Sequence, residues 1–390
     1  GPSGNRGTFH LNTGQRAFKY TAPSGFKALC TQNLDDTFSG AELNNPSKYF
    51  DIKTWSGQSS GVLTIKGYDF SPDTVWIKIR SGTSNWRWAD RLRGAGKSLL
   101  HDAADGEYTN VGSGHVDSFT DDGFTLEGGT GGTNIATAGD GNTYVGFAWD
   151  AGTAASGANN DGSINVSAGN QWKNATAGFS ITKYVSNNTS GATVGHGLGV
   201  PPEFIIVKNT DDTNNWNVYH KDIGNTHGLY LDLNNAKGDD ASLWNDTSPT
   251  NAVFSLGNGN GTNNASSHEY MAYCWTPIPG YSAFGTYVGT GSAKNFIYLG
   301  FKPRYFMLKP IDATDDWRIF DTARNTINPV NTQLKPNENS AEASDATLAI
   351  DFVSNGVGLQ ASLNSGINGS GTNFMYAAFA EHPFKLARAA

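Results

Sequence analysis

The sequence predicts an all-β protein that contains three consecutive β-sandwich-like repeat modules. Glycine supplies 48 of the 390 residues, well above the usual ~7 %, so turns must be frequent. Charged residues make up only 16 % of the chain and aromatic residues 12 %, and long runs with helical periodicity are nearly absent. These observations favour short strands joined by polar turns. An internal repeat then divides the chain into modules.

One hairpin occurs three times, at residues 75–90, 204–220 and 305–321. In each copy a lysine is followed eight residues later by a tryptophan, and four residues after that comes an acid or a histidine. The three sets are Lys78, Trp86 and Asp90, then Lys208, Trp216 and His220, and finally Lys309, Trp317 and Asp321. Constant spacing across a variable loop predicts one geometry. We therefore expect the lysines and tryptophans to form the structural core of the repeats.

The repeats define modules at residues 46–150, 172–280 and 281–390. Each module closes with a strand that is apolar at nearly every residue, which is typical of a central strand covered on both faces. Solenoid repeats run ~20–50 residues, so units of roughly a hundred residues are interpreted as complete modules. The sequence leaves open whether the modules surround a shared axis or follow one another in a line.

Residues 151–171 separate the first two modules and are rich in small polar residues. Such a segment cannot bury enough apolar area to fold alone. The composition therefore predicts a flexible linker or a surface arm.

Several classes of partner are disfavoured by composition. The net charge is -8 and the 27 lysines and arginines form no basic run, whereas nucleic-acid binding needs a concentrated basic face. No apolar stretch is long enough to span a membrane, and the N-terminus lacks a signal-peptide pattern. The two cysteines, Cys30 and Cys274, cannot build a disulfide framework. We expect neither nucleic-acid binding nor membrane insertion.

Catalytic motifs are missing from the sequence. The recurring acids Asp90 and Asp321 are replaced by His220 in the second copy, so they do not form a repeated catalytic pair. There is no HExxH motif for zinc, and the glycine-rich runs lack the lysine and helix of a phosphate loop. We expect a protein that is not an enzyme and that needs no metal or cofactor, although Asp-rich loops leave a structural calcium ion open.

Candidate ligand contacts are sought where the copies differ, because a scaffold repeats and a specificity patch need not. Aromatic faces bury the C–H surfaces of sugars well, but the recurring tryptophans are assigned to the core. The unshared candidates are Trp172, Tyr230, Trp244 and Asp246.

Residues 12–34, NTGQRAFKYTAPSGFKALCTQNL, resemble the C-terminal edge of the SPRY-like modules of bacteriophage fibre proteins. The matching positions are Gly14 to Arg16, Tyr20 and Thr21, Gly25 to Leu29, and Asn33 and Leu34. The resemblance implies that residues 1–45 are the short remnant of an upstream β module and a connector.

From about residue 190 onward the chain is similar to an uncharacterised repeat family of marine tailed-phage fibre proteins. The carrying segments are GHGLGVPPEFIIVKN, YMAYCWTPIPGYSAFGTYVGTG, YLGFKP and FMYAAFAEHPFK. The resemblance implies a virion fibre segment that binds a host-surface glycan or protein and contacts other virion proteins. Multivalent display and symmetric closure favour a homotrimer.

Three alternatives remain at this stage. A capsid decoration or head fibre protein would share the same architecture, and so would a cellular surface adhesin. A polysaccharide depolymerase tailspike would need two carboxyl groups within about 10 Å in a groove.

Overall fold

The computed structural model describes residues 43, 45–109, 112–130, 132–265, 267–291, 295–360 and 365–382. The segment that resembles a SPRY-like module lies outside this part of the chain. Within it the protein is nearly all-β, with several antiparallel sheets, which confirms the all-β part of the expected fold class. The described helices are short: η3 (Pro46–Lys48), α1 (Ala241–Trp244), η4 (Ala346–Leu348) and α2 (Ser365–Asn368).

Unit 1, residues 50–149, contains a four-stranded sheet in the order β1-β9-β3-β4. Its strands are β1 (Phe50–Ser56), β9 (Thr143–Trp149), β3 (Thr74–Ile79) and β4 (Arg87–Asp90). A smaller sheet packs over it and consists of β2 (Val62–Lys66), β8 (Gly123–Glu127) and β7 (Val116–Thr120). The short pair β5 (Lys97–Ser98) and β6 (Tyr108–Thr109) completes the unit.

Unit 2, residues 179–275, contains the order β12-β19-β14-β15 within an eight-stranded sheet. These strands are β12 (Phe179–Val185), β19 (Glu269–Trp275), β14 (Phe204–Asn209) and β15 (Asn217–His220). The sheet is extended on one side by β10 (Thr153–Ala154) and β11 (Gln171–Asn174), and on the other by β16 (His227–Tyr230) and β17 (Gly238–Asp239). The small sheet pairs β13 (Ala192–Gly195) with β18 (Val253–Leu256).

Unit 3, residues 282–382, contains a four-stranded sheet in the order β20-β28-β22-β23. The strands are β20 (Ser282–Val288), β28 (Asn373–His382), β22 (Lys302–Pro310) and β23 (Arg318–Asp321). Its small sheet consists of β21 (Asn295–Tyr298), β27 (Gly356–Leu359) and β26 (Ile350–Val353). The pair β24 (Thr332–Gln333) and β25 (Ala343–Ser344) lies beside β23.

The strand order of the large sheet is therefore the same in each unit, and the strand that closes the unit (β9, β19 or β28) is hydrogen-bonded on both sides. Alternate residues of each large sheet point to opposite faces. In β3, for example, Val75 and Ile77 face the small sheet, whereas Trp76 faces the other way. Each unit thus has an outer core between its two sheets.

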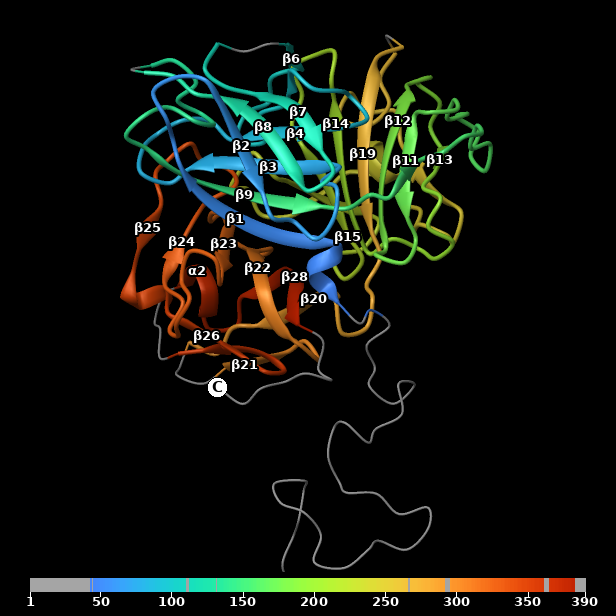
Figure 1. Cartoon of the computed structure of the whole chain (residues 1–390). Helices are drawn as coiled ribbons and strands as arrows, with labels where there is room; N and C mark the ends of the chain where they lie inside the picture. Colours follow the sequence, from blue (N-terminus) through green and yellow to red (C-terminus); the bar gives the residue numbers. More distant parts are fainter. Residues whose placement is uncertain are drawn as a thin grey trace, which may run out of the picture.

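The second face of all three large sheets contributes to one central hydrophobic cluster. Aromatic rings from different units stack there: Trp88 on Trp216 at 4.8 Å, Phe204 on Phe284 at 5.7 Å, and Phe50 on Phe379 at 4.9 Å between ring centroids. Figure 1 shows the three units side by side, unit 1 in blue to green, unit 2 in green to yellow, and unit 3 in orange to red. Of the two arrangements that the sequence leaves open, the structure has the units around a shared centre.

The segment between units 1 and 2 lies as an arm on unit 2. Within the arm, Asn159 bridges Val166, and Ile164 bridges Val194 of β13. Ile164 and Val166 are 6 % and 1 % exposed and belong to the outer core of unit 2. These two apolar residues anchor an otherwise polar segment.

In the described part of the chain, no helix has the length and apolar character needed to cross a membrane.

Candidate functional site

The recurring tryptophans lie at the junctions between units, each with its indole N–H donated to a main-chain carbonyl of another unit. Trp86 of unit 1 donates to Lys335 (3.0 Å) and Glu338 (3.1 Å) of unit 3, Trp216 of unit 2 to Leu100 (2.9 Å) of unit 1, and Trp317 of unit 3 to Tyr230 (2.9 Å) of unit 2. The three contacts run head to tail and close a ring.

The recurring lysines cross the same junctions. Each ammonium donates at least one hydrogen bond to a carbonyl of its own unit and one to a carbonyl of the neighbouring unit. The bonds to the neighbouring unit join Lys78 to Asn339 (3.1 Å), Lys208 to Ala104 (3.0 Å) and Lys309 to Asn234 (3.3 Å). The same three carbonyls accept a main-chain N–H, from Ser84 (3.1 Å), Asn214 (2.8 Å) and Asp315 (2.9 Å) respectively. One main-chain geometry is therefore used at all three junctions.

Burial gives these lysines an unusual electrostatic state. It lowers the pKa of each to about 8, because removing the ammonium from water disfavours the charged form. The facing carboxyl groups Asp102 and Asp232 have their pKa raised by burial to about 6. A lysine that is partly neutral near pH 8 can act as a nucleophile, but these three side chains have no exposed surface, so no substrate can reach them.

The acid or histidine of each hairpin is also buried. Asp90 accepts hydrogen bonds from Arg93 (2.6 Å) and from the hydroxyl of Tyr273 in unit 2 (2.8 Å). Asp321 is paired in the same way with Arg324 at 2.5 Å. In unit 2 burial lowers the pKa of His220 to about 4, so this ring is neutral. These groups hold the turns that follow β4, β15 and β23.

A carboxyl pair of the kind that a depolymerase would need does occur, between Asp73 and Asp150. Burial and the adjacent Asp150 carboxylate raise the pKa of Asp73 well above its usual value. However, Asp73 accepts a main-chain N–H from Ala151 (2.8 Å), and Asp150 accepts one from Gly152 (2.6 Å). Asp73 also pairs with Arg91 at 3.1 Å. The pair therefore fixes the base of the arm, and it lines neither of the hollows described below.

The four residues expected to contact a ligand do not form one site. Trp172 on β11 and Tyr230 on β16 are separated by four strands of the same sheet, about 24 Å at the usual strand spacing. Trp172 is half-buried against the central cluster, and Tyr230 is half-buried beside the indole of Trp317. Trp244 lies in α1 and is only 1 % exposed, so a ligand could not reach it without opening the unit. Asp246 is exposed.

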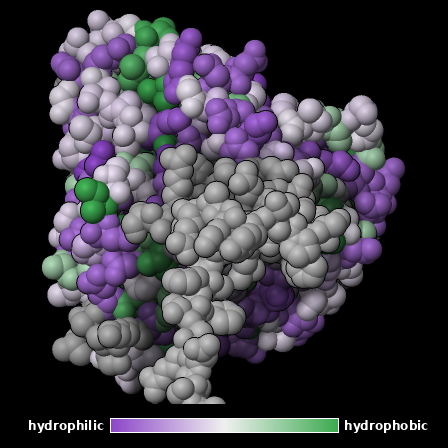
Figure 2. All heavy atoms as spheres, turned by 60° about the horizontal axis from the view of Figure 1, so that its bottom comes forward, coloured by the Kyte–Doolittle hydropathy of each residue, from purple (hydrophilic) through white to green (hydrophobic). Residues whose placement is uncertain are grey.

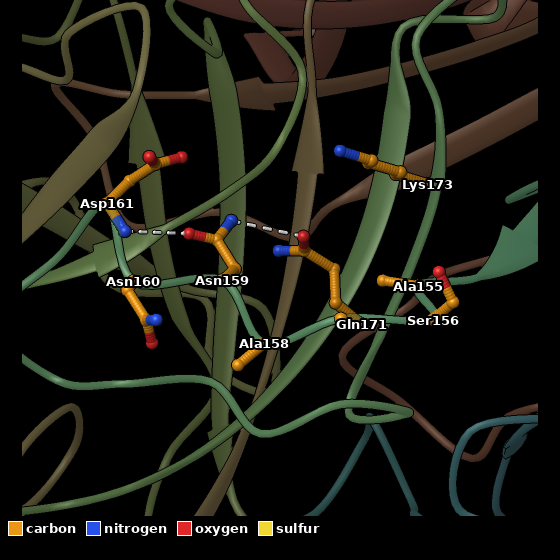
Figure 3. A pocket seen from close by; sticks show the side chains of 9 residues that line it. Ala155, Ser156, Ala158, Asn159, Asn160, Asp161, Gln171 and Lys173 are labelled. Carbon is orange, nitrogen blue, oxygen red and sulfur yellow. Dashed lines mark hydrogen bonds between the residues drawn. The ribbon is translucent and has the colours of Figure 1, made fainter.

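A hollow of about 340 Å³ lies between the arm and β11, lined by residues 155–161 with Gln171 and Lys173. Figure 3 shows Asn159 at the centre of this lining, hydrogen-bonded to Gln171 and to Asp161. Asn159 donates to Gln171 at 3.1 Å and accepts the main-chain N–H of Asp161 at 3.0 Å. The lining contains no aromatic side chain.

A second hollow of about 430 Å³ lies beside β14 and β15 of unit 2. Its wall is rich in proline, namely Pro201, Pro202, Pro249 and Pro277. The ion pair between Lys221 and Glu203, 2.6 Å apart, borders it. Because these two charges neutralise each other, the hollow offers no free charge to a ligand.

Large exposed hydrophobic side chains are few in the described residues, and two of them share one strand. Figure 2 shows a mostly hydrophilic face with small separate hydrophobic spots outside the grey atoms. Phe296 and Tyr298 of β21 are 50 % and 68 % exposed. They are two residues apart and so point to the same side of the sheet. Neither residue is among the ligand contacts predicted from the sequence, although NFIY places the apolar Ile297, here buried, between two aromatic residues.

No group of three or more His, Cys, Asp or Glu side chains suited to a metal ion occurs in the residues that the structure describes.

Comparison with known proteins gives one match. A family model described as a domain of unknown function, DUF7483, matches residues 45–383. No curated protein and no solved structure matches the chain.

Proposed function

The chain belongs to the DUF7483 family of domains of unknown function, and we propose that this member is a non-enzymatic structural and receptor-binding segment of a bacteriophage fibre. The proposal places the chain in the virion, where it contacts other virion proteins and a glycan or protein of the host surface. Support for the phage setting comes from the resemblance of residues 12–34 and of the segments after residue 190 to phage fibre proteins.

The observation that carries the structural role is the use made of the recurring lysines and tryptophans. Each is fully buried and bonded to a main-chain carbonyl of a neighbouring unit. The buried lysines, whose pKa values are lowered, thus hold the units together. In an enzyme, ionisable groups with shifted pKa values usually line a cleft. What remains at the surface differs from unit to unit, which suits display and attachment.

The three units are further proposed to be repeat modules of one ancestral β-sandwich, preceded by the remnant of a SPRY-like module. The shared strand order β1-β9-β3-β4, β12-β19-β14-β15 and β20-β28-β22-β23 supports this. A homotrimer of such chains would present each binding surface three times and so gain avidity.

The proposal is tested on the phage that encodes the chain. An antibody raised against the purified chain should label the fibres in electron micrographs, and the purified chain, added first, should reduce phage adsorption to host cells several-fold. Label confined to the capsid shell would instead support a capsid decoration or head fibre protein. Release of reducing ends from host polysaccharide by the purified chain would contradict the non-enzymatic role.

A further inference from the structure

The outer face of the small sheet of unit 3 carries two exposed aromatic side chains and is here called the aromatic shelf. Strand register pairs Phe296 with Gly358 and Tyr298 with Gly356, and cross-strand partners share a face. The neighbouring strand β26 adds Asp351, the partner of Gly358. Two aromatic rings therefore stand at one edge, with the Phe296 ring against the buried Gly356. The half-buried Gly358 lies between these rings and a carboxylate on the far side.

A polar pair borders Gly358 opposite the aromatic rings. The side-chain amide of Gln360 donates a hydrogen bond to the carboxylate of Asp351 at 2.6 Å. Gln360 is exposed and Asp351 half-buried. The Tyr298 hydroxyl has no hydrogen-bond partner among the described residues. The shelf thus offers apolar ring faces together with donors and acceptors that can exchange partners.

Units 1 and 2 provide an internal comparison, because β2, β13 and β21 occupy the same place in their small sheets. Where unit 3 pairs Phe296 with Gly358, unit 1 pairs Thr64 with Thr125 and unit 2 pairs Thr193 with Ser255. In unit 1 this face is closed by a hydrogen bond of 2.6 Å between Ser118 and Thr125. In unit 2 the edge is covered by the arm at Ile164. Of the three positions, the one in unit 3 alone is aromatic and is not covered by any described residue.

A purely structural role explains part of this arrangement. An aromatic ring that covers a cross-strand glycine supports strand pairing, and a Cβ at Gly356 would lie 3.0 Å from the Phe296 ring. Yet half or more of each aromatic side chain is still exposed. A binding partner that covered these ring faces would therefore be stabilised by burying them.

We propose that the aromatic shelf binds a neutral glycan; the inference rests on the proposed function and names the site and ligand class for it. Sugar rings present C–H faces to aromatic side chains and hydroxyls to amides and carboxylates. Phe296 and Tyr298 lie about 7 Å apart along the strand, so successive sugar rings of one chain would cover both. Gly358 has no side chain, and no atom lies closer than 3.8 Å to its Cβ position, which leaves room for such a chain to lie across the sheet.

Charge selects neutral over acidic glycans. Asp351 is the one Asp, Glu, His, Lys or Arg side chain that strand register places on this face of β21, β27 and β26. The whole chain carries a net charge of -8. Uronic or sialic acids would meet repulsion from both, whereas the hydroxyls and acetamido groups of neutral sugars would not.

The test uses the labelled full chain on immobilised oligosaccharides of glucose, galactose and N-acetylglucosamine, beside uronic-acid-containing and sialylated ones of similar size. A Cβ at Gly358 would meet no atom closer than 3.8 Å, so Gly358→Thr keeps the fold and fills the space where a sugar ring would lie. Binding to neutral oligosaccharides should fall at least tenfold in Gly358→Thr and in the double variant Phe296→Ala/Tyr298→Ala. Thr64→Ala/Lys66→Ala, on the matching face of unit 1, should bind as the wild type does.

Equal binding by the wild type and both shelf variants would overturn the inference, and so would binding to acidic oligosaccharides alone or to none. Thermal unfolding of each variant separates loss of the site from loss of the fold. Phage adsorption distinguishes failure of the proposed glycan site from failure of the proposed receptor-binding role. If the wild type and the shelf variants block adsorption equally, the shelf is wrong and the receptor-binding role stands; if the wild type does not block it, the role itself fails.

Discussion

The lysines at the unit junctions are buried, and removing their ammonium groups from water costs free energy. Lys208 donates to the carbonyls of Ala104 and Asn214 at 3.0 and 2.8 Å, and it faces the carboxyl group of Asp232. These bonds offset part of the cost of removing the ammonium from water. They also fix the register between units 1 and 2, because a one-residue shift would leave the cation without partners.

The lowered lysine pKa has a consequence for stability. Lys208 titrates near pH 8 in the folded protein and near 10.5 when unfolded, so between these values the unfolded chain binds more protons. Stability contributed by this group therefore rises with pH across that window. Relative to Lys208→Met, the wild type should gain about 2 kcal/mol between pH 7 and pH 9.5, measured by urea unfolding. Lys48→Met, at an exposed position, is the control and should track the wild type.

At the scale of elements, the arm buries little apolar surface, although β10 pairs with β11 and Ser163 exchanges hydrogen bonds with Thr193. Ile164 and Val166 supply its buried apolar surface, and Asp73 and Asp150 fix its base. An element with so little burial opens more readily than the sheets do.

Ile164→Ala/Val166→Ala should release the arm while leaving the units folded. We expect a protease of broad specificity to cleave within residues 155–170 at least several-fold faster. Mass spectrometry of the fragments measures this cleavage. The midpoint of global unfolding should move little. The matched control is Asn165→Ala/Ser167→Ala, at exposed positions of the same arm. Equal cleavage rates in all three proteins would show that the two apolar residues are not its anchor.

Sequence patterns predict what lies within an element better than what meets across units. The spacing of Lys78 and Trp86 and the alternation of Val75 and Ile77 follow from local strand geometry. By contrast, the partners of Trp86 are main-chain carbonyls far along the chain, and a carbonyl has no sequence signature. The sequence predicts Trp244 as a ligand contact rather than a core residue, because the four-residue helix that buries it is too short to show periodicity.

The candidate site illustrates the same limit. Phe296 and Tyr298 are visible as alternating aromatics, but their glycine partners lie in β27, some sixty residues later. Only the pairing register shows that these glycines lie next to the rings. Sequence alone therefore favoured loop residues such as Asp246, whose neighbours it could not define.

For the whole molecule, a shared central cluster predicts a single cooperative transition. All three large sheets bury one face in it, so no unit can lose its structure without exposing the apolar surface of the others. Calorimetry should therefore give one transition whose van't Hoff and calorimetric enthalpies agree. A core substitution in one unit, such as Val218→Ala in unit 2, should lower the midpoint for tryptophan fluorescence and for circular dichroism together. Separate transitions for three units would contradict a shared core.

The head-to-tail contacts also delay the packing of unit 1 during synthesis, because its partners in unit 3 are translated last. Trp86 is translated long before its carbonyl partners at Lys335 and Glu338, which follow 249 and 252 residues later. At about 5–20 residues per second, a ribosome needs roughly 12–50 s to deliver them. Throughout that interval the aromatic side chains of unit 1 that face the central cluster lack their unit 3 partners, so the nascent chain exposes an apolar surface that favours aggregation.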